Sequence, residues 1–516
     1  MKMSSRKEVT VAISVAEVES NFEELKRYLV KASERSSRID EIERGVFEHL
    51  QRISFAAIEA HIEGQGDGDV GETLILEDGR KLKRLEKKHS RKYVSIFGRH
   101  ELMRTAYGTR ETQKIEAVPL DAILGLPEGD FSYVLQDWDQ GFCVEQPFSK
   151  SAMQIERIFK LSTTSSSLQH MNRSMSETID DFRATIPAPP AEAEGEIMVL
   201  TADCKGVPHR RQAGDPAPKD PKHPTRGEKR NKKKMACVGV SYTVDRFVRT
   251  TEDILNEVLH KKSQENRPRP QNKQIQANLT RNIDGMDING KDLTFAWLRE
   301  ELERRNPEGT RPVVFLSDGE HALEDRAFKW FEIDDETGVC CFFQDDQAKP
   351  VEIVFILDLF HALVPLWDVA SIFHEEGTPQ RKAFVEKRLR MLLQGKVKDV
   401  IRGLRQMKTK HRLRGDKART IDRLANYYEH NIHRMRYDEY LAQGYPIGSG
   451  VVEGACGNLI FDRLERTGMR WDTQGAQAML DLRAIWINGQ WDQFCTFRVK
   501  HESQRLYPYR HLFNAA

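Results

Sequence analysis

The chain has 516 residues, of which 39% are hydrophobic and 31% are charged, and its formal net charge is +1 at pH 7. This balance is typical of a globular protein and excludes a disordered or membrane-spanning chain, while the length allows two to four domains. The near-zero net charge alone would argue against a nucleic-acid partner.

The charge is nevertheless distributed in blocks. Residues 206–234 carry ten Lys and Arg against three Asp and Glu, and residues 381–440 carry eighteen against seven. Basic blocks in an otherwise acidic chain indicate surfaces for a polyanion such as nucleic acid. The alternative interpretation is a solvated basic loop and solvated helix faces.

The cysteines and the N-terminus predict an intracellular protein. Seven cysteines are scattered without a C-x-x-C pair, so we expect neither a disulfide framework nor a cysteine-based zinc site. Residues 1–10 are charged and lack the apolar stretch of a secretory signal, and no run approaches the ~18 apolar residues of a membrane helix.

The first part of the chain is predicted to be mainly helical. Apolar residues recur at helical spacing over residues 15–62, and a glycine-rich stretch at 64–71 ends that pattern. Two β-rich runs around Gly98, within residues 93–107, predict a hairpin. Helical character returns over residues 131–182.

A helix–turn–helix pattern lies within this second helical stretch. Its helices are predicted over residues 151–161 and 168–179, and a Ser/Thr-rich turn at 162–167 joins them. The pattern is found in DNA-binding domains, where it reads base edges in the major groove, but it is also common in other helical domains.

The character of the sequence changes after residues 186–196, which are rich in Pro, Ala and Glu and are predicted to be a linker. Buried-type strands then alternate with helices, which indicates an α/β layer. The strands are expected at residues 197–202, 235–244, 312–317 and 351–357, and the helices at 293–304 and 321–330. The basic stretch 206–234 is expected to be a long loop between the first two strands.

Three acidic residues stand at the ends of predicted elements. Asp203 and Asp318 each end a strand, and Glu453 lies near the start of a helix. The carboxyl ends of neighbouring strands meet in one crevice, and three carboxylates there repel one another unless cations are present. Carboxylate oxygens are the ligands that Mg²⁺ prefers, so the cluster predicts a metal site. Taken singly, each residue also suits a turn, a loop or a helix N-terminus.

The sequence around the glutamate carries a resemblance. Residues 444–471 read GYPIGSGVVEGACGNLIFDRLERTGMRW, residues 358–361 read DLFH, and residues 118–126 read VPLDAILGL. Together these stretches resemble the ISKra family of bacterial insertion-sequence transposases, which are related to the Mutator-like group and have a DDE catalytic site. The resemblance implies that Asp203, Asp318 and Glu453 are the catalytic, metal-binding triad.

The fold class that the resemblance implies is an α/β catalytic core with an RNase H-like mixed sheet and flanking helices. An all-α insertion interrupts this core, and a mainly helical DNA-binding region precedes it. The predicted domain boundaries are an N-terminal helical region (1–70), a hairpin with the helix–turn–helix (71–185), the linker (186–196), the first part of the core (197–373), a basic all-α insertion (374–440) and the second part of the core with the C-terminal tail (441–516).

The expected activity is transposition of DNA. Two Mg²⁺ ions, or Mn²⁺ in their place, would clamp the attacking and leaving oxygens of a phosphoryl displacement. The partners would be the element's terminal inverted repeats and target DNA, bound by a homo-oligomer in the bacterial cytoplasm at the nucleoid, with no membrane. Two alternatives remain open: a transposase-derived DNA-binding regulator that does not cut, and an RNase H-like nuclease that cuts without joining.

Departures from the family pattern concern target choice rather than reaction class. The basic loop after Asp203 is long, and Gly-Glu-His-Ala-Leu follows Asp318 where an aromatic residue is expected.

Further residues are assigned as supports of the metal site or as DNA contacts. Asp358 and His361 share one helical face, and they form either a support of the metal site or a pair that buttresses the core. Arg463, Arg466 and Arg470 follow the glutamate and suit bidentate phosphate contact, or a solvated helix face. Candidates for contact with the DNA backbone are Arg210, Arg211, Lys229, Arg230, Lys232, Lys233, Lys234, Lys408, Lys410, Arg412 and Arg414.

Overall fold

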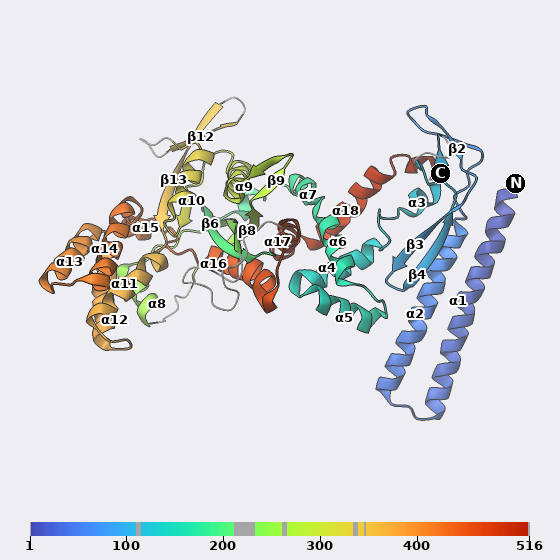
Figure 1. Cartoon of the computed structure of the whole chain (residues 1–516), viewed down its shortest axis with the longest axis horizontal. Helices are drawn as coiled ribbons and strands as arrows, with labels where there is room; N and C mark the ends of the chain where they lie inside the picture. Colours follow the sequence, from blue (N-terminus) through green and yellow to red (C-terminus); the bar gives the residue numbers. More distant parts are fainter. Residues whose placement is uncertain are drawn as a thin grey trace, which may run out of the picture. The chain divides into compact units, whose positions relative to one another are not determined.

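The computed structural model describes residues 2–109, 115–210, 233–260, 266–333, 339–344 and 347–513. The chain forms two compact units, the first made of residues 1–182 and 490–516 and the second of residues 183–489 (Figure 1). Within the described part of the chain, no helix combines the length and the apolar character needed to cross a bilayer.

The first unit begins with a helical hairpin. Helices α1 (Lys2–Glu34) and α2 (Ile39–Gly64) lie side by side, and Leu25, Ala32 and Ala56 are buried between them. Asp40 and Glu41 stand in the first turn of α2, where acidic side chains favour the positive end of the helix dipole. The helical prediction for residues 15–62 is therefore confirmed as two helices.

Short antiparallel strands follow the hairpin of helices. Strands β3 (His89–Ser95) and β4 (Gly98–Arg104) pair with Ser95 opposite Gly98, so a two-residue turn joins them where the sequence predicts a hairpin. A separate three-stranded sheet contains β1 (Thr73–Ile75), β2 (Lys81–Arg84) and β5 (Tyr107–Gly108).

Helices complete the first unit. They are α3 (Pro119–Leu124), α4 (Tyr133–Glu145), α5 (Phe148–Phe159), α6 (Ser165–Ser176), the start of α7 (Ile179–Thr185) and α18 (Trp491–Leu506). Helices α4, α5 and α6 pack on one another, and the Thr164 side chain caps α6 by accepting the Ser167 N–H at 3.0 Å. The two helices of the predicted helix–turn–helix are thus present, with a shorter turn than expected. Helix α18 joins this unit through Trp491, whose indole N–H donates to Asp137 at 2.6 Å.

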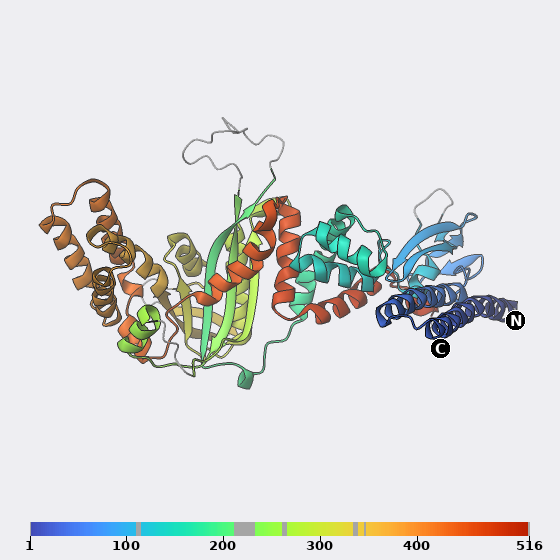
Figure 2. The same ribbon diagram turned by 90° about the horizontal axis from the view of Figure 1, so that it is seen from below.

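A six-stranded sheet lies at the centre of the second unit, and its strands run side by side in Figure 2. The order is β12-β13-β11-β6-β7-β8. The bounds are β6 Ile197–Pro208, β7 Lys233–Val244, β8 Gln271–Leu279, β11 Val313–Ser317, β12 Val339–Gln344 and β13 Gln347–Leu357. Strands β6, β7 and β8 form an antiparallel meander, β11 runs parallel to both β6 and β13, and β12 pairs antiparallel with β13. The small hairpin β9 (Arg281–Ile283) and β10 (Met286–Ile288) lies apart from this sheet.

Helices cover the sheet and explain its continuous apolar strands. Met198 and Leu200 of β6 share one core with Phe295 of α9 (Gly290–Arg305) and Leu323 of α10 (His321–Trp330). The residues of β11 are buried on both sides of the strand, which is typical of a parallel strand covered on both faces. The α/β layer predicted from the alternation of strands and helices is confirmed.

Strands β6 and β7 are longer than predicted. They remain paired as far as Pro208 and Lys233, so both ends of the expected basic loop belong to the sheet. Backbone pairing along a regular ladder does not need apolar side chains, which explains why hydrophobicity alone ended these strands too early. Residues 211–232 of the predicted loop lie outside the described residues.

The segment 374–440 consists of helices and turns without a strand. After α11 (Leu359–Phe373) come α12 (Pro379–Leu393), α13 (Val397–Lys410), α14 (Gly415–His430) and α15 (Tyr437–Ala442). Leu389, Leu404 and Ile421 are fully or almost fully buried, so the basic helices have an apolar side that packs inward.

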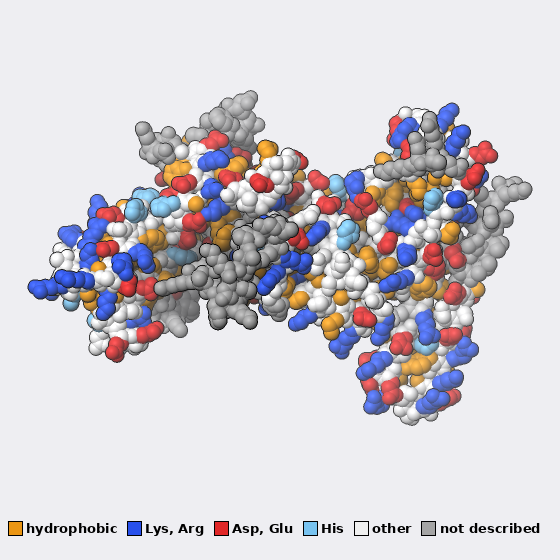
Figure 3. Space-filling model, viewed as in Figure 1, with side chains coloured by type: hydrophobic (Ala, Val, Ile, Leu, Met, Phe, Trp, Pro, Cys, Tyr) orange, Lys and Arg blue, Asp and Glu red, His pale blue; other side chains and the backbone are white. Residues whose placement is uncertain are grey.

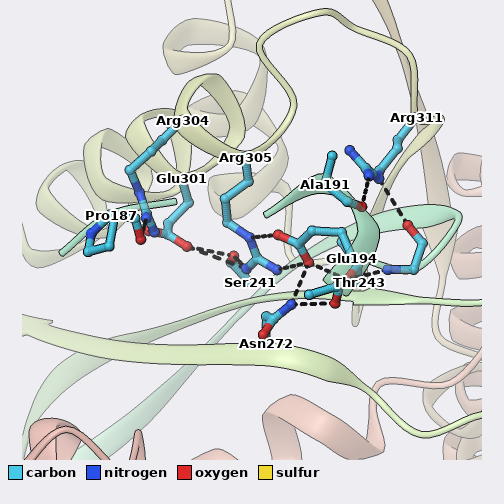
Figure 4. Close-up of polar contacts among 12 residues, drawn as sticks. Pro187, Ala191, Glu194, Ser241, Thr243, Asn272, Glu301, Arg304, Arg305 and Arg311 are labelled. Atoms are coloured by element: carbon cyan, nitrogen blue, oxygen red, sulfur yellow. Dashed lines mark hydrogen bonds and ion pairs between the residues drawn. The ribbon is translucent and has the colours of Figure 1, made fainter. Parts of the chain in front are cut away.

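A buried ion pair holds the predicted linker against the sheet (Figure 4). Arg305 donates to both carboxylate oxygens of Glu194, at 2.7 and 2.8 Å, and the two side chains are at most 1% exposed. The Thr243 hydroxyl and the Asn272 amide also donate to Glu194. Arg311 donates to the carbonyls of residues 191 and 195, so this stretch is bound to the second unit rather than extended through solvent.

Candidate functional site

Two of the predicted acidic residues lie next to each other on the interior strands β6 and β11, at the edge of the sheet formed by the carboxyl ends of its parallel part. In the parallel pair β6–β11, Leu316 is opposite Thr201. The same register, continued by two residues, places Asp318 beside Asp203. Aligned residues of neighbouring strands point to the same face, so both carboxylates reach one crevice.

A turn fixes Asp318 at the end of its strand. Gly319 has φ +88°, a left-handed conformation that glycine adopts without strain, and α10 begins two residues later. The Asp318 carboxylate accepts the Glu320 N–H at 2.9 Å, and its carbonyl accepts the Tyr427 hydroxyl at 2.8 Å. The chain therefore leaves the sheet sharply while Asp318 remains at the edge.

A third aspartate, Asp358, follows β13, the neighbour of β11 on the other side. Because Ser317 is opposite Leu357 in the β11–β13 pair, Asp358 aligns with Asp318. An aspartate therefore stands at the same level on each of three adjacent parallel strands, within β6 for Asp203 and directly after β11 and β13 for Asp318 and Asp358. The two neighbours differ in accessibility, since Asp358 is fully buried and Asp318 is half-buried.

The buried carboxylate of Asp358 is occupied by backbone donors. One oxygen accepts the N–H groups of Phe360 and His361 and so caps α11, while the other accepts the N–H of Ser449. Burial raises its pKa, but the hydrogen bonds from His361 and Ser449 outweigh burial and hold the pKa below its usual value. Asp358 therefore connects the end of β13 to the segment that leads into the glutamate helix.

Glu453 approaches the aspartates from α16 (Gly450–Cys456). This short helix packs against β6 and β7, and the Cys456 thiol donates to an oxygen of Asp203 at 3.5 Å. The Glu453 side chain is 52% exposed and is therefore accessible to a ligand. A wider π-helical stretch, Gly457–Glu465, follows α16, and such turns are frequent near functional sites.

His361 lies among the acidic side chains. Its Nδ1 is 3.8 Å from an Asp358 oxygen and 3.7 Å from a Glu453 oxygen. The Asp358 carboxylate raises the pKa of His361 to about 9 against the opposing effect of burial, and the charges of Asp318 and Glu453 add to this. At neutral pH the imidazole is protonated and supplies positive charge to the cluster.

The pKa of Asp203 is raised in this cluster. Burial raises the pKa of Asp203, and the charge of Asp318 raises it further, although the Cys204 N–H and the charge of His361 act in the opposite direction. A cation bound at this edge would relieve that repulsion.

The cluster offers donors that suit a hard divalent cation. Among the described residues, the three whose ligand atoms lie within 4.8 Å of one another are Asp358, His361 and Glu453. Asp203 and Asp318 flank this group without belonging to it. Asp358 accepts three backbone N–H groups, whereas Asp203 accepts one N–H and a thiol and Asp318 accepts one N–H, so Asp358 has less acceptor capacity left for a cation than either of them.

The three arginines predicted to follow the glutamate occupy different environments. Arg463 is fully buried and lies over the Trp471 ring at 5.1 Å, so it packs within the second unit. Arg466 is exposed and is 3.7 Å from Asp462. Arg470 is also exposed, and its carbonyl accepts a hydrogen bond from Arg210 at 3.0 Å.

The described ends of the basic stretch contact the segment after the glutamate. The N–H of Arg210 donates to the Trp471 carbonyl at 2.8 Å, Lys233 pairs with Glu465, and the Lys234 ammonium donates to the Thr473 hydroxyl at 2.6 Å. The other candidates in this stretch, Arg211, Lys229, Arg230 and Lys232, lie outside the described residues.

A basic groove of about 810 Å³ lies along α13. Its lining includes Lys398, Arg402, Arg405 and Lys410, of which only Lys410 is among the single residues predicted to contact DNA. Lys and Arg side chains gather over α13 and α14 in Figure 3. Arg412 and Arg414, between these helices in the sequence, are exposed, and Lys408 pairs with Asp422 at 2.7 Å.

A smaller pocket, of about 320 Å³, adjoins the acidic cluster. Phe360 and Gly448, the neighbours of His361 and Ser449, line it together with Arg249 and Arg267. Sequence reasoning missed both arginines, since they lie far along the chain from Asp203, Asp318 and Glu453 and only the fold brings them near the acidic cluster.

Comparisons with known proteins give a distant likeness. No protein-family model matches the sequence, and no curated protein matches it. Among solved structures, the Drosophila P element transposase strand transfer complex is similar at a TM-score of 0.26 with 10% sequence identity, over 72% of this chain and 81% of that chain.

Proposed function

We propose that the chain is a DNA transposase that cuts and joins DNA by metal-dependent phosphoryl transfer, like the ISKra-type enzymes that its glutamate motif resembles. The observation that carries the proposal is the register of β6 and β11, which aligns Asp203 with Asp318, together with Glu453 on the helix that packs against β6. In this proposal three carboxylates from three separated parts of the sequence bind a cation together, at the carboxyl end of β6 and β11.

The order of the strands supports an RNase H-like core. A three-stranded antiparallel meander, β6 to β8, is extended on the β6 side by two parallel strands, β11 and β13, and helices cross between them. In this proposal the helices of residues 374–440 are an insertion between the second aspartate and the glutamate.

The proposed cofactor is Mg²⁺, for which Mn²⁺ would substitute, held by Asp203, Asp318 and Glu453. Their oxygens are hard donors, and the charge of Asp318 adds to burial in raising the pKa of Asp203, an effect that a bound cation would oppose. When bound, the metal would act as a Lewis acid on the phosphate and activate the attacking oxygen.

The neighbouring residues orient this site. Asp358 binds the Ser449 N–H and so positions the start of the glutamate helix, and Cys456 fastens that helix to Asp203. His361 supplies positive charge between Asp358 and Glu453, where a DNA phosphate also needs a positively charged neighbour.

The basic surfaces are the proposed DNA contacts. The groove along α13 suits the sugar–phosphate backbone, since Lys398 and Lys410 can each replace a condensed counterion. Arg402 and Arg405 already pair with Asp399 and Glu429. Helices α4, α5 and α6 are the proposed readers of the terminal inverted repeats, because three mutually packed helices with a short turn can present one helix to a major groove. Joining two element ends requires two active sites, so we propose that the chain acts as a homo-oligomer on DNA.

The test uses labelled DNA that carries the sequences flanking the gene. Purified wild type, Asp203→Asn and the control Asp325→Asn, an exposed acidic residue of α10, are compared with Mg²⁺ and with EDTA. We expect a nick at a discrete end and joined product for wild type and the control, and neither for Asp203→Asn. Specific binding without cutting would support the regulator instead, and cutting without joining would support the nuclease.

A further inference from the structure

Helix α1 carries an exposed apolar stripe. The side chains of Val15, Phe22 and Leu29 are 41%, 49% and 40% exposed, although all three are large and apolar. They are spaced seven residues apart, so they lie on nearly the same line along the helix. A row of half-exposed large apolar side chains along one line of a helix is typical of a surface that another element covers.

The packing of α1 within the chain leaves this stripe free. Leu25 and Ala32, which are buried, face α2 and form the seam of the helical hairpin. Figure 1 shows α1 on the outer side of α2, away from strands β3 and β4. The stripe therefore lies beside the seam, on a face that the described part of the first unit does not cover.

The stripe is symmetric about Phe22. Val15 precedes Phe22 by seven residues and Leu29 follows it by seven. If a second α1 crossed in the antiparallel direction with Phe22 opposite Phe22, each Val15 would meet a Leu29 of the other copy. A two-fold axis through Phe22 would thus cover all three side chains with their own equivalents.

The charges beside the stripe agree with the antiparallel direction. Glu19 and Lys26 lie on the same flank of the stripe, three residues before and four residues after Phe22. In an antiparallel pair, residues of the same flank meet, so Glu19 of each copy would face Lys26 of the other. Within one chain Lys26 pairs with Glu23 at 2.7 Å and lies 4.9 Å from the Phe22 ring, and so it is already held beside the stripe.

A parallel pair would lack this complementarity. Phe22 would again meet Phe22, but Glu19 would face the opposite flank, which contains Val18 and Leu25 rather than a basic residue. Exposed ion pairs add little affinity, yet they select between two directions that bury similar apolar area.

We propose that two copies of the chain associate through α1, antiparallel, with the two-fold axis at Phe22. The contact is independent of the metal site, so it forms without DNA and without Mg²⁺. If the two copies did not associate through α1, the proposed metal-dependent cutting would still stand. If the protein did not cut DNA, the proposed α1 contact would still stand.

Cysteine cross-linking distinguishes the two directions. The full-length variants Val15→Cys, Phe22→Cys and Leu29→Cys carry either of two tags and are oxidised without DNA, alone and in pairs, with wild type as the background for the native cysteines. We expect Phe22→Cys to cross-link with itself and Val15→Cys with Leu29→Cys, each at least tenfold above wild type. Cross-linking of Val15→Cys with itself above its yield with Leu29→Cys would establish the parallel direction and overturn the proposal.

A second experiment measures association directly. Phe22→Glu places like charges at the axis, and we expect at least a tenfold increase in the dissociation constant measured by sedimentation, with an unchanged helical circular dichroism spectrum. Lys31→Gln, which changes the charge by the same amount at an exposed position on the opposite side of α1, is the matched control and should associate like wild type. Equal association of Phe22→Glu and wild type would exclude α1 as the contact.

Discussion

The buried carboxylate of Asp358 accepts a hydrogen bond from the backbone N–H of Ser449, ninety-one residues later in the chain. This bond joins the end of β13 to the segment that starts the glutamate helix. The position of Glu453 relative to the strands therefore depends on a residue that does not itself need to bind a metal.

Replacing Asp358 with alanine should remove the bond that holds the start of the glutamate helix, α16, to the end of β13. The change leaves the N–H groups of Ser449 and Phe360 without their acceptor, which costs about 1–3 kcal/mol of the free energy of unfolding. We expect the rate of DNA cutting to fall at least tenfold while DNA affinity stays within about twofold. Denaturant unfolding and the cutting assay measure the two effects, and Asp358→Asn, which keeps one acceptor oxygen, should lose less stability. A fully active Asp358→Ala would contradict the positioning role.

The Glu194–Arg305 pair should be strongly coupled. Glu194→Ala leaves the fully buried Arg305 guanidinium with Glu301, 3.5 Å away, as its remaining carboxylate. Breaking a buried pair completely costs about 3–5 kcal/mol, so we expect a loss of up to that size. The double variant Glu194→Ala with Arg305→Met should be less destabilised than the sum of the single variants. Urea unfolding of the four proteins measures this, and strictly additive losses would show that the pair is not coupled.

Asp139 should make stability depend on pH. Its carboxyl is completely buried on α4 and its oxygens lack a hydrogen-bond partner among the described residues, and burial raises its pKa to about 7. Between the unfolded pKa of about 4 and the folded value, the folded state binds more protons than the unfolded state, so this residue lowers stability progressively as pH rises.

Asp139→Asn removes that ionisation. We expect the variant to be more stable than wild type at pH 8, by up to about 4 kcal/mol, with the gain shrinking toward zero near pH 4. Thermal unfolding across this range measures it, and Asp130→Asn, an exposed residue nearby in sequence, is the control. A gain that did not change with pH would show that Asp139 is not the titrating group.

The groove along α13 should carry part of the salt dependence of DNA binding. Lys398→Ala and Lys410→Ala each remove one positive charge from its lining. Each should reduce the slope of log K against log salt by about 0.9 if it contacts one phosphate. Fluorescence anisotropy between low and moderate salt gives the slopes, with Lys329→Ala on α10 as the control. Slopes equal to that of wild type would place the DNA elsewhere.

The sequence predicted those parts of the fold that depend on local pattern. Apolar runs identified β6, β7, β11 and β13, and helical spacing identified α1, α2, α5 and α6. Strand β8, with the sequence QNKQIQANL, was missed, because polar residues alternate with its buried Ile275, Ala277 and Leu279 and pairing with β7 holds them in the sheet. The order of polar and apolar residues along one segment does not reveal which strand it pairs with.

The candidate site was predictable in its residues but not in its arrangement. The sequence predicted Asp203 and Asp318 at the ends of strands and assigned Asp358 from the DLFH motif, whereas the common level of the three residues depends on the register of three strands. Arg463 was expected near the site because it follows Glu453, yet the π-helical turn and the Trp471 ring place it in the interior. The spacing of two residues predicts whether their side chains share one side of a helix only when the helix is a regular α-helix between them.

The central claim is that Asp203, Asp318 and Glu453 act together as one cation site. Calorimetric titration of Mn²⁺ into purified protein tests it without DNA, with Asp203→Asn, Asp318→Asn and Glu453→Gln beside the control Asp325→Asn. We predict that wild type and the control bind Mn²⁺ and that each of the other three variants binds at least tenfold more weakly. Unchanged Mn²⁺ affinity in Asp318→Asn and Glu453→Gln would contradict the account.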